Sequence, residues 1–367
     1  MRGDASLASA VPIRWSVATR RLPEAAPPRT PSTAVMKATR TPSFALAIAF
    51  VAVFALAAST NAPPSPATES RLWEATDVRA RFALRRGGVS SRLRIASTAV
   101  LPGATLEIAA LDRDGAPLEI EVTGAKGLTP TRRGVWVLSA PKRPGLRVLR
   151  VSSAQARDEI RLNVFVIVPR AKSAKQALNG YAIGRYPEAA LVQGARVEPP
   201  SGFIEVTREN IDTPISPRLR LGQFLCKQES AFPKYVVLDE RLPGKLEALL
   251  DAIRAAGTPA QTLTVMSGYR TPAYNRALGN ATSFSRHLWG AAADVFVDES
   301  PRDGRMDDLD GNGVVDVRDS EHLFALADAL DRDPGEDWFV GGAGYYPATG
   351  SHGPWVHVDV RTHAARW

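Results

Sequence analysis

The chain has 367 residues, of which 44% are hydrophobic and 23% are charged, so it can bury one full core and has room for a second. Its formal net charge is +8 at pH 7, but seven basic residues and only two acidic ones lie within residues 1–62. A nucleic-acid-binding protein needs its basic side chains on the folded part of the chain, where they contact phosphates. The charge distribution therefore argues against a nucleic-acid partner.

A secretory signal is predicted near the N-terminus. Residues 36–62 read MKATRTPSFALAIAFVAVFALAASTNA, in which a short basic segment precedes an apolar run and then small residues. This order is typical of a signal peptide and predicts a periplasmic or secreted protein. The apolar run is marginal for spanning a bilayer, so we expect no stable membrane span after cleavage, with an uncleaved anchor as the alternative. Residues 1–35 show no periodicity and are interpreted as a disordered extension or the product of an upstream start codon.

The only cysteine of the sequence is Cys226, so no disulfide can form within the chain. It lies in the apolar stretch QFLCKQ, which favours a buried, unreactive thiol over a nucleophile. A chain without disulfides is compatible with the bacterial periplasm or a cell surface.

The middle of the chain is predicted to be rich in strands. After a linker at residues 63–71, residues 72–169 contain about seven short alternating segments separated by turn clusters such as RDGA and KRPG. This spacing predicts a small β-sandwich of immunoglobulin-like architecture. The segment contains no histidine and no cluster of acids, so we assign it no chemistry. Residues 170–235 lack clear periodicity and are expected to connect the sandwich to the next domain.

Residues 236–367 are predicted to form an α+β domain. A helix expected over residues 242–257 places four apolar residues on one face: Leu246, Leu249, Leu250 and Ile253. The stretch QTLTVMSGYR that follows indicates a strand ending in a turn, and WVHVDVR near the C-terminus indicates a last strand.

Three residues of this domain could form a catalytic zinc site, which takes three ligands from histidine and carboxylate side chains and leaves one position open. His287 and Asp294 can both reach one ion if the intervening LWGAAA folds back tightly, and Gly290 gives that turn its freedom. His357 could supply the third ligand from the last strand, where it shares a face with Asp359. The residues alone leave the structural alternative open, because single histidines often occur as structural residues.

Three motifs in this part of the chain resemble those of the zinc D-Ala-D-Ala carboxypeptidase family, which also includes peptidoglycan endopeptidases. The segment SRHLWGAAAD (residues 285–294) resembles the family's SxHxxGxAxD signature. The segments SGYRTPAYN (residues 267–275) and GGAGYYPATGSHGPWVHVDVR (residues 341–361) resemble motifs of the murein-endopeptidase branch. The resemblance covers about residues 200–367 and implies a C-terminal domain of hedgehog/D-Ala-D-Ala peptidase type.

The resemblance also implies roles for individual residues. The zinc ligands of the family correspond to His287, Asp294 and His357, and its motif arginine corresponds to Arg270, which would neutralise charge on the oxyanion. The general base is open between His352 and Asp359, because Pro354 stands where many relatives place it. Asp359 could equally orient a ligand histidine.

A second metal site is predicted between the zinc motifs. The stretch DLDGNGVVDVRD, within an insertion at residues 303–320, matches a calcium loop that resembles EF-hand and dockerin repeats. The predicted ligands are Asp308, Asp310, Asn312, the carbonyl of Val314, Asp316 and Asp319. A solvated acidic turn is the alternative, and the stretch SEHLFALADAL that follows predicts a helix.

Taken together, the sequence predicts an exported zinc metallopeptidase that hydrolyses peptide bonds in the peptide stems of peptidoglycan, as a murein endopeptidase or a D,D- or L,D-carboxypeptidase. The predicted cofactors are Zn²⁺ and Ca²⁺. The alternative is a cell-wall-binding protein that keeps both metals without turnover, and a calcium-dependent adhesion module is a third hypothesis. The sequence carries no prediction of oligomeric state.

Overall fold

The computed structural model describes residues 78–170, 176–192, 195–280, 282–332, 339–361 and 363–367. The predicted signal peptide, the segment before it and the linker lie outside the described residues. No helix in the described ranges is long and apolar enough to cross a membrane.

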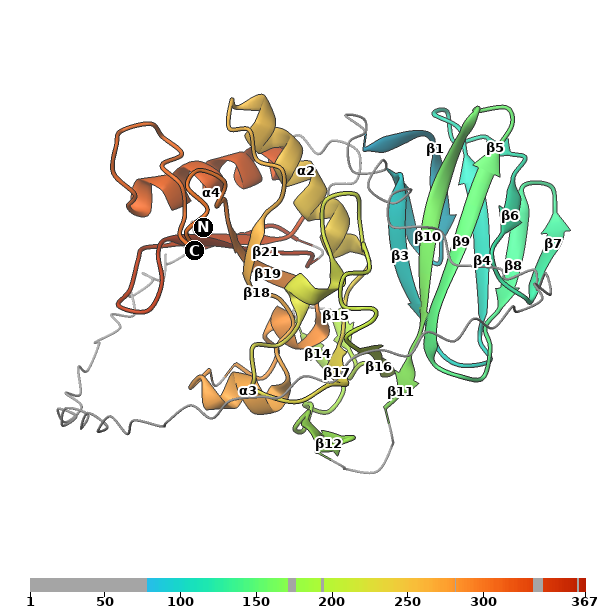
Figure 1. Ribbon diagram of the computed structural model, residues 1–367, viewed down its shortest axis with the longest axis horizontal. Helices are drawn as coiled ribbons and strands as arrows, with labels where there is room; N and C mark the ends of the chain where they lie inside the picture. Colours follow the sequence, from blue (N-terminus) through green and yellow to red (C-terminus); the bar gives the residue numbers. More distant parts are fainter. Residues whose placement is uncertain (1–77, 171–175, 193–194, 281, 333–338, 362) are drawn as a thin grey trace, which may run out of the picture. The chain divides into compact units, whose positions relative to one another are not determined.

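Ten strands, blue to green in Figure 1, form two sheets in the first part of the described chain. One sheet has the order β2-β1-β4-β8-β7, with β5 paired to β4, and the other has the order β3-β10-β9-β6. The strands of the first sheet are β1 (Arg79–Arg86), β2 (Val89–Leu93), β4 (Thr105–Leu111), β5 (Pro117–Leu118), β7 (Leu128–Arg132) and β8 (Val135–Ser139). Those of the second are β3 (Ile95–Val100), β6 (Glu121–Thr123), β9 (Gly145–Ser153) and β10 (Asp158–Val166). Neighbouring strands are antiparallel except β3 and β10, which are parallel.

The two sheets share one apolar core. Phe82 and Ile108 from the first sheet and Leu149 and Leu162 from the second are fully buried in the same cluster. Alternate residues of β1 are buried, as expected for a strand with one face on a core. The predicted strand-rich segment is therefore a pair of packed sheets, and its immunoglobulin-like classification stays a prediction.

Short sheets follow this pair. Strands β11 (Val168–Pro169), β16 (Gly202–Val206) and β17 (Lys234–Val236) form a three-stranded sheet. Two hairpins pair β12 (Ala177–Leu178) with β13 (Tyr181–Ala182) and β14 (Ala190–Val192) with β15 (Ala195–Val197). Phe203 and Tyr235 of the three-stranded sheet belong to the same core cluster as the C-terminal elements. The segment predicted as a connection thus contributes to the core of the C-terminal domain.

The C-terminal domain is built on a five-stranded sheet with the order β18-β19-β21-β20-β22. Its strands are β18 (Thr264–Ser267), β19 (Ala292–Phe296), β20 (Gly342–Tyr346), β21 (Trp355–Asp359) and β22 (Ala365–Arg366). The helices are α2 (Arg241–Ala255), α3 (Pro272–Ala277) and α4 (Val317–Arg332), with 3-10 helices η1 (Leu221–Phe224) and η2 (Arg286–Trp289). This mixture of strands and helices agrees with the predicted α+β class.

One face of this sheet joins the core, and the strand alternation decides which side chains are left for the opposite face. Val356 and Val358 of β21 are fully buried with Leu249 of α2 and Leu323 of α4, so His357 between them faces away from that cluster. The four apolar residues predicted for one face of the helix at 242–257 are all buried in α2. The helix itself ends at Ala255, and Gly257 follows with a φ of +102°.

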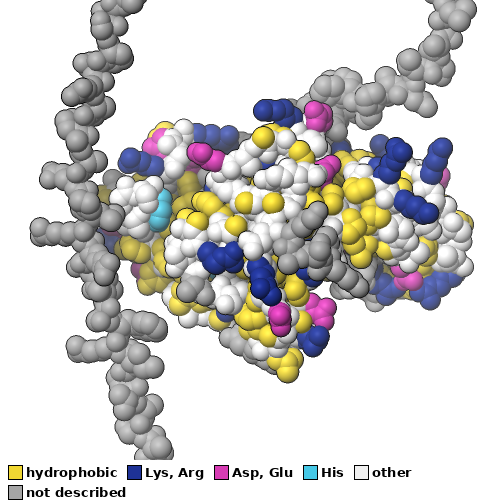
Figure 2. All heavy atoms as spheres, turned by 90° about the horizontal axis from the view of Figure 1, so that it is seen from below, with side chains coloured by type: hydrophobic (Ala, Val, Ile, Leu, Met, Phe, Trp, Pro, Cys, Tyr) yellow, Lys and Arg dark blue, Asp and Glu magenta, His cyan; other side chains and the backbone are white. Residues whose placement is uncertain are grey.

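Basic side chains do not form a stripe on the face shown in Figure 2. Lys and Arg side chains (dark blue) stand in separate groups among hydrophobic and uncharged atoms, with acidic side chains (magenta) between some of them. A continuous positive track, which phosphate backbones require, is not visible on this face.

Candidate metal centre

Three elements bring the predicted zinc ligands together. Asp294 lies in the middle of β19 and His357 in the middle of β21, and the antiparallel register places these two residues directly opposite each other. His287 comes from η2, which precedes β19. The exposed fractions are 3% for His287, 1% for Asp294 and 8% for His357. The strand register alone therefore brings two of the three predicted ligands together.

The turn after η2 depends on Gly290. Its φ is +62°, in the left-handed region, where residues with a side chain are strained. A Cβ atom at this position would lie 2.0 Å from the carbonyl oxygen of Val237. The prediction that this glycine lets the chain fold back between His287 and Asp294 is therefore supported by both backbone angle and space.

The donor atoms have the separations of a tetrahedral metal site. Nε2 of His287 lies 3.3 Å from Nδ1 of His357 and 3.3 Å from Oδ1 of Asp294. Nδ1 of His357 lies 2.8 Å from the same carboxylate oxygen. Ligands bound to one zinc ion at about 2.0–2.1 Å in tetrahedral geometry lie about 3.3 Å apart. Two nitrogens and one carboxylate oxygen in this arrangement fit zinc with one position left open.

The outer nitrogen of each histidine has an acceptor that orients the ring. Nδ1 of His287 donates to the carbonyl of Gly268 at 2.7 Å. Nε2 of His357 donates to Oδ2 of Asp359 at 3.3 Å. Carbonyl and carboxylate acceptors of this kind are usual behind metal-binding histidines, because they fix the tautomer that turns a lone pair to the metal.

Burial and the neighbouring acids act in opposite directions on the ligand pKa values. Burial lowers the pKa of His287. Burial would also lower the pKa of His357, but its hydrogen bonds to Asp294 and Asp359 outweigh it and raise the value. For Asp294, burial favours the neutral acid, yet the two histidines outweigh burial and hold its pKa well below the usual range. Asp294 is thus ionised and ready to bind a cation.

Arg270 lies beside the three predicted ligands, at the turn after β18. Its Nη2 pairs with Oδ2 of Asp294, and its Nε donates to Oγ of Ser267 at 2.7 Å. Arg270, which is predicted to neutralise charge on the oxyanion, therefore also pairs with the carboxylate of a predicted metal ligand.

Neither candidate base lines the cavity at the metal ligands. Asp359 is fully buried, and its carboxylate accepts hydrogen bonds from His357, from Arg361 and from the backbone N–H of Gly342. His352 lies in the loop between β20 and β21, where its Nδ1 is 2.9 Å from the carbonyl of Gly353. Its ring centroid is 6.0 Å from that of Trp355, which does line the cavity.

The three predicted ligands line a cavity of about 530 Å³. The lining residues besides the three ligands and Arg270 are Val192, Asn280, Thr282, Phe284, Ser285, Arg286, Tyr346, Trp355, Arg361 and Trp367. Ser285 and Arg286 belong to the segment that resembles the signature motif, and Tyr346, Trp355 and Arg361 belong to the last quoted motif. The other lining residues carried no sequence signal.

Aromatic rings form one wall of this cavity. Tyr346 and Trp355 stack with centroids 4.0 Å apart, and the ring of Trp367 lies 5.3 Å from that of His357. Nε1 of Trp367 donates to the hydroxyl of Tyr346. A Cβ atom on Gly344 would lie 2.6 Å from Nε1 of Trp367, so this glycine makes room for the indole. Sequence reasoning missed Trp367, which lies ten residues beyond the last ligand.

The predicted calcium loop forms a turn in which aspartate side chains accept hydrogen bonds from backbone N–H groups of the same loop. Carboxylate oxygens of Asp308, Asp310 and Asp319 approach within 4.8 Å of one another. Asp308 accepts from the backbone N–H of Gly313 at 2.7 Å, and Asp319 accepts from that of Asp316 at 2.7 Å. The helix expected after the loop is confirmed as α4. Calcium binding by the loop stays a prediction.

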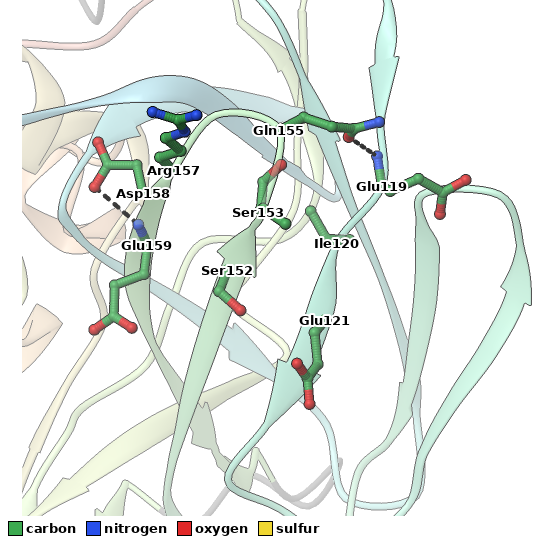
Figure 3. Close-up of a pocket in the computed structure, with 10 residues that line it drawn as sticks. Glu119, Ile120, Glu121, Ser152, Ser153, Gln155, Arg157, Asp158 and Glu159 are labelled. Carbon is green, nitrogen blue, oxygen red and sulfur yellow. Dashed lines mark hydrogen bonds between the residues drawn. The ribbon is translucent and has the colours of Figure 1, made fainter.

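A larger cavity, of about 780 Å³, lies at one end of the paired sheets. Figure 3 shows the acidic side chains of Glu119, Glu121 and Glu159 around it, together with basic Arg157 and uncharged side chains. Glu119 pairs with Arg133 and Glu159 with Arg150, so two of these acids already have partners. None of the described residues that line this cavity is a histidine, and the predicted zinc ligands line the cavity of about 530 Å³ instead.

Comparison with known protein families gives a match to the segment that contains two of the three predicted zinc ligands. Residues 223–309 match the sequence model of the family Peptidase M15. The matched segment includes Arg270, His287 and Asp294, and His357 lies beyond it. The match supports a metallopeptidase of the D-Ala-D-Ala carboxypeptidase type. No curated protein matches the chain.

Two solved structures show weak likeness to parts of the chain. The crystal structure of the S-layer protein SbsC domains 4 and 5 is 17% identical, covers 20% of this chain and 48% of that one, and has a TM-score of 0.16. The structure of surface layer protein SbsC, domains 1–6, is 12% identical, covers 31% of this chain and 20% of that one, and has a TM-score of 0.18. Scores this low carry no argument about fold or function.

Proposed function

We propose that this protein is an exported zinc metallopeptidase that hydrolyses peptide bonds in the stems of peptidoglycan. The observation that carries the proposal is the convergence of His287, Asp294 and His357, whose donor atoms lie 2.8–3.3 Å apart at the wall of a cavity. The Peptidase M15 match adds the reaction class, and the three motif resemblances add the substrate class.

Each residue of the site has a distinct part in the proposed reaction. When bound, zinc lowers the pKa of a water molecule towards about 7 and polarises the carbonyl of the bond to be cut. His287, Asp294 and His357 hold the ion, and Asp359 keeps the tautomer of His357 that binds it. Arg270 has Nε and Nη2 engaged, so we assign Nη1 to donate to the oxyanion that forms.

The base is assigned by elimination between the two candidates. Both oxygens of Asp359 already accept hydrogen bonds, which supports a positioning part rather than proton transfer. The ring centroid of His352 lies 6.0 Å from that of Trp355, which lines the cavity. His352 forms no ion pair among the described residues, so we propose it as the general base. His352→Ala should lower kcat by about 100-fold or more with zinc content unchanged. Unchanged kcat would remove it from this part.

Digestion of purified peptidoglycan sacculi tests the function directly. Mass spectrometry of the soluble products, with zinc and with a chelator, should show chelator-sensitive release of muropeptides. Product masses tell endopeptidase from carboxypeptidase, because only the second releases a single terminal residue. His287→Ala should abolish release, and His322→Ala, which changes a histidine on α4 outside the site, should not.

One observation favours a second candidate function. Neither candidate base lines the cavity at the metal ligands, as expected for a zinc-containing cell-wall-binding protein without turnover. Stoichiometric zinc and binding to sacculi, with no product released, would establish that candidate. Export is tested separately, since N-terminal sequencing of the mature protein should begin near residue 63 if the predicted signal peptide is cleaved.

A further inference from the structure

Among the described residues, the cavity at the proposed metal ligands is lined by three arginines and by one acid, Asp294. Two of the arginines are held by acids. Arg270 pairs with Asp294, and Arg361 pairs with Asp359 through Nε and Nη2. The third, Arg286, forms no hydrogen bond or ion pair through its side chain with any residue that the structure describes.

The acids near Arg286 are already engaged. Those that act on it electrostatically are Asp359 and Asp239. Asp359 is held by Arg361, and Asp239 is held by Arg241, whose Nη2 lies 2.6 Å from its Oδ2. A half-buried guanidinium has lost part of its hydration and needs acceptors in return. The described protein atoms do not provide them.

Arg286 lies where two cavities meet. It lines the cavity of about 530 Å³ at the metal ligands and also a neighbouring one of about 320 Å³. Its backbone is fixed, because its carbonyl accepts the N–H of Ala291 at 3.1 Å in the turn that precedes β19. It is also the direct sequence neighbour of His287. A ligand group held by this side chain would therefore lie beside the bond presented to the metal site.

We propose that Arg286 is a specificity-determining residue that binds a carboxylate of the substrate peptide. This inference rests on the proposed peptidase function and names the chemistry by which the same site selects its substrate. A guanidinium suits the task because it stays charged and offers two parallel N–H donors to the two oxygens of a carboxylate. Asn280 and Thr282, which line the same cavity, offer uncharged donors to the rest of the peptide.

Two sources could supply this carboxylate. One is the C-terminal carboxylate of a peptide, as in a carboxypeptidase substrate, and the other is an acidic side chain within a longer peptide. Three probes separate them: N-acetyl-D-alanyl-D-alanine, its C-terminal amide, and the amide of N-acetyl-D-glutamyl-D-alanine. Only the first has a terminal carboxylate, only the third has a side-chain carboxylate, and the second has neither.

Titration calorimetry measures the Kd of each probe for the full zinc-loaded chain. For any probe that is hydrolysed, KM and kcat are measured instead. The variants are Arg286→Gln, Arg286→Lys and the matched control Arg276→Gln, an exposed arginine on α3 that lines neither cavity. Thermal unfolding and zinc content confirm that each variant is folded and loaded.

We expect wild type to bind one carboxylate probe more tightly than the amide probe. Arg286→Gln should weaken that binding, or raise KM, by about 10- to 100-fold with little change in kcat, and leave the amide unaffected. Arg286→Lys should recover part of the loss, and Arg276→Gln should behave as wild type. Whichever carboxylate probe shows the effect identifies the source.

Equal binding of all three probes by wild type, or equal loss of all three in Arg286→Gln, would overturn the inference. Its failure is distinct from that of the proposed function. Zinc-dependent hydrolysis without a carboxylate preference would refute the proposed role of Arg286 but would support the proposed peptidase function. A carboxylate preference that depends on Arg286, without hydrolysis of any peptide, would support the role of Arg286 and refute the peptidase function.

Discussion

Replacing Asp359 by asparagine distinguishes two roles that this residue could have at the proposed metal centre: orienting His357 and acting as the general base. The carboxylate accepts the Nε2–H of His357 at 3.3 Å, the N–H of Gly342 at 2.8 Å and the Nε–H of Arg361 at 2.9 Å. Asparagine keeps the shape and one acceptor oxygen but removes the charge. His357 then loses the anion that holds its proton on Nε2 and its lone pair on Nδ1.

The expected cost follows from the contact with His357. Removing a carboxylate behind a metal-binding histidine lowers metal affinity by about 10- to 100-fold, which is about 1.4 to 2.8 kcal/mol. A general base behaves differently, since its loss lowers the rate by about 100- to 10,000-fold without weakening the metal. Zinc affinity and turnover at full zinc occupancy therefore distinguish the two parts.

Competition with a chromophoric chelator at pH 7.5 measures zinc affinity in wild type, Asp359→Asn and the control Asp328→Asn. Asp328 lies on α4, where it pairs with Arg366 and Arg332, and it contacts no proposed ligand. We expect the 10- to 100-fold loss in Asp359→Asn alone. Zinc affinity within twofold of wild type, together with a 100-fold fall in kcat/KM at saturating zinc, would refute the positioning argument and make Asp359 the base.

Three further predictions concern stability. Gly290→Ala should lower the free energy of unfolding by more than about 1 kcal/mol and reduce zinc content, because its Cβ would lie 2.0 Å from the carbonyl oxygen of Val237; urea unfolding that matches wild type would contradict this. Burial lowers the pKa of Lys245 from 10.5 to about 8, so the folded chain releases that proton before the unfolded chain does. The free energy of unfolding of wild type relative to Lys245→Met should therefore rise between pH 8 and 10.5, by about 3 kcal/mol in total, and a flat difference would show that burial does not perturb Lys245. Asp319→Ala should lower the melting temperature, because the N–H groups of Leu309 and Asp316 lose their acceptor. If the loop also binds calcium as predicted, 1–10 mM calcium (roughly, as for extracellular modules) should raise the melting temperature of wild type and not that of Asp319→Ala.

Much of the C-terminal domain could be predicted from local patterns. The buried face of α2, the helix α4 after the acidic loop and the alternation of Val356 and Val358 in β21 follow from spacing along the chain, which sets the faces of helices and strands. The need for glycine at position 290 also followed from the short distance between two expected ligands. The end of α2 differs by two residues from the pattern, since helix ends depend on capping.

Other features depended on contacts between distant segments. The acceptor behind His287 is a backbone carbonyl 19 residues earlier, and a backbone atom leaves no mark on the choice of residue. Trp367 reaches the cavity only because Gly344 leaves space for its indole on a neighbouring strand. The two candidate bases were equal in sequence, and only their hydrogen bonds separate them.

The sequence by itself determined which residues could bind a metal, because histidine and carboxylate chemistry and the order of three motifs are local properties of the chain. Only the tertiary structure decided that Asp294 and His357, 63 positions apart, meet across β19 and β21 with their donor atoms 2.8 Å apart. It also decided that, within the described part of the chain, Arg286 has no acidic partner while Arg270 and Arg361 are paired. Strand register and the competition among nearby charges are set by the packing of the whole domain, so they appear only when the chain is folded.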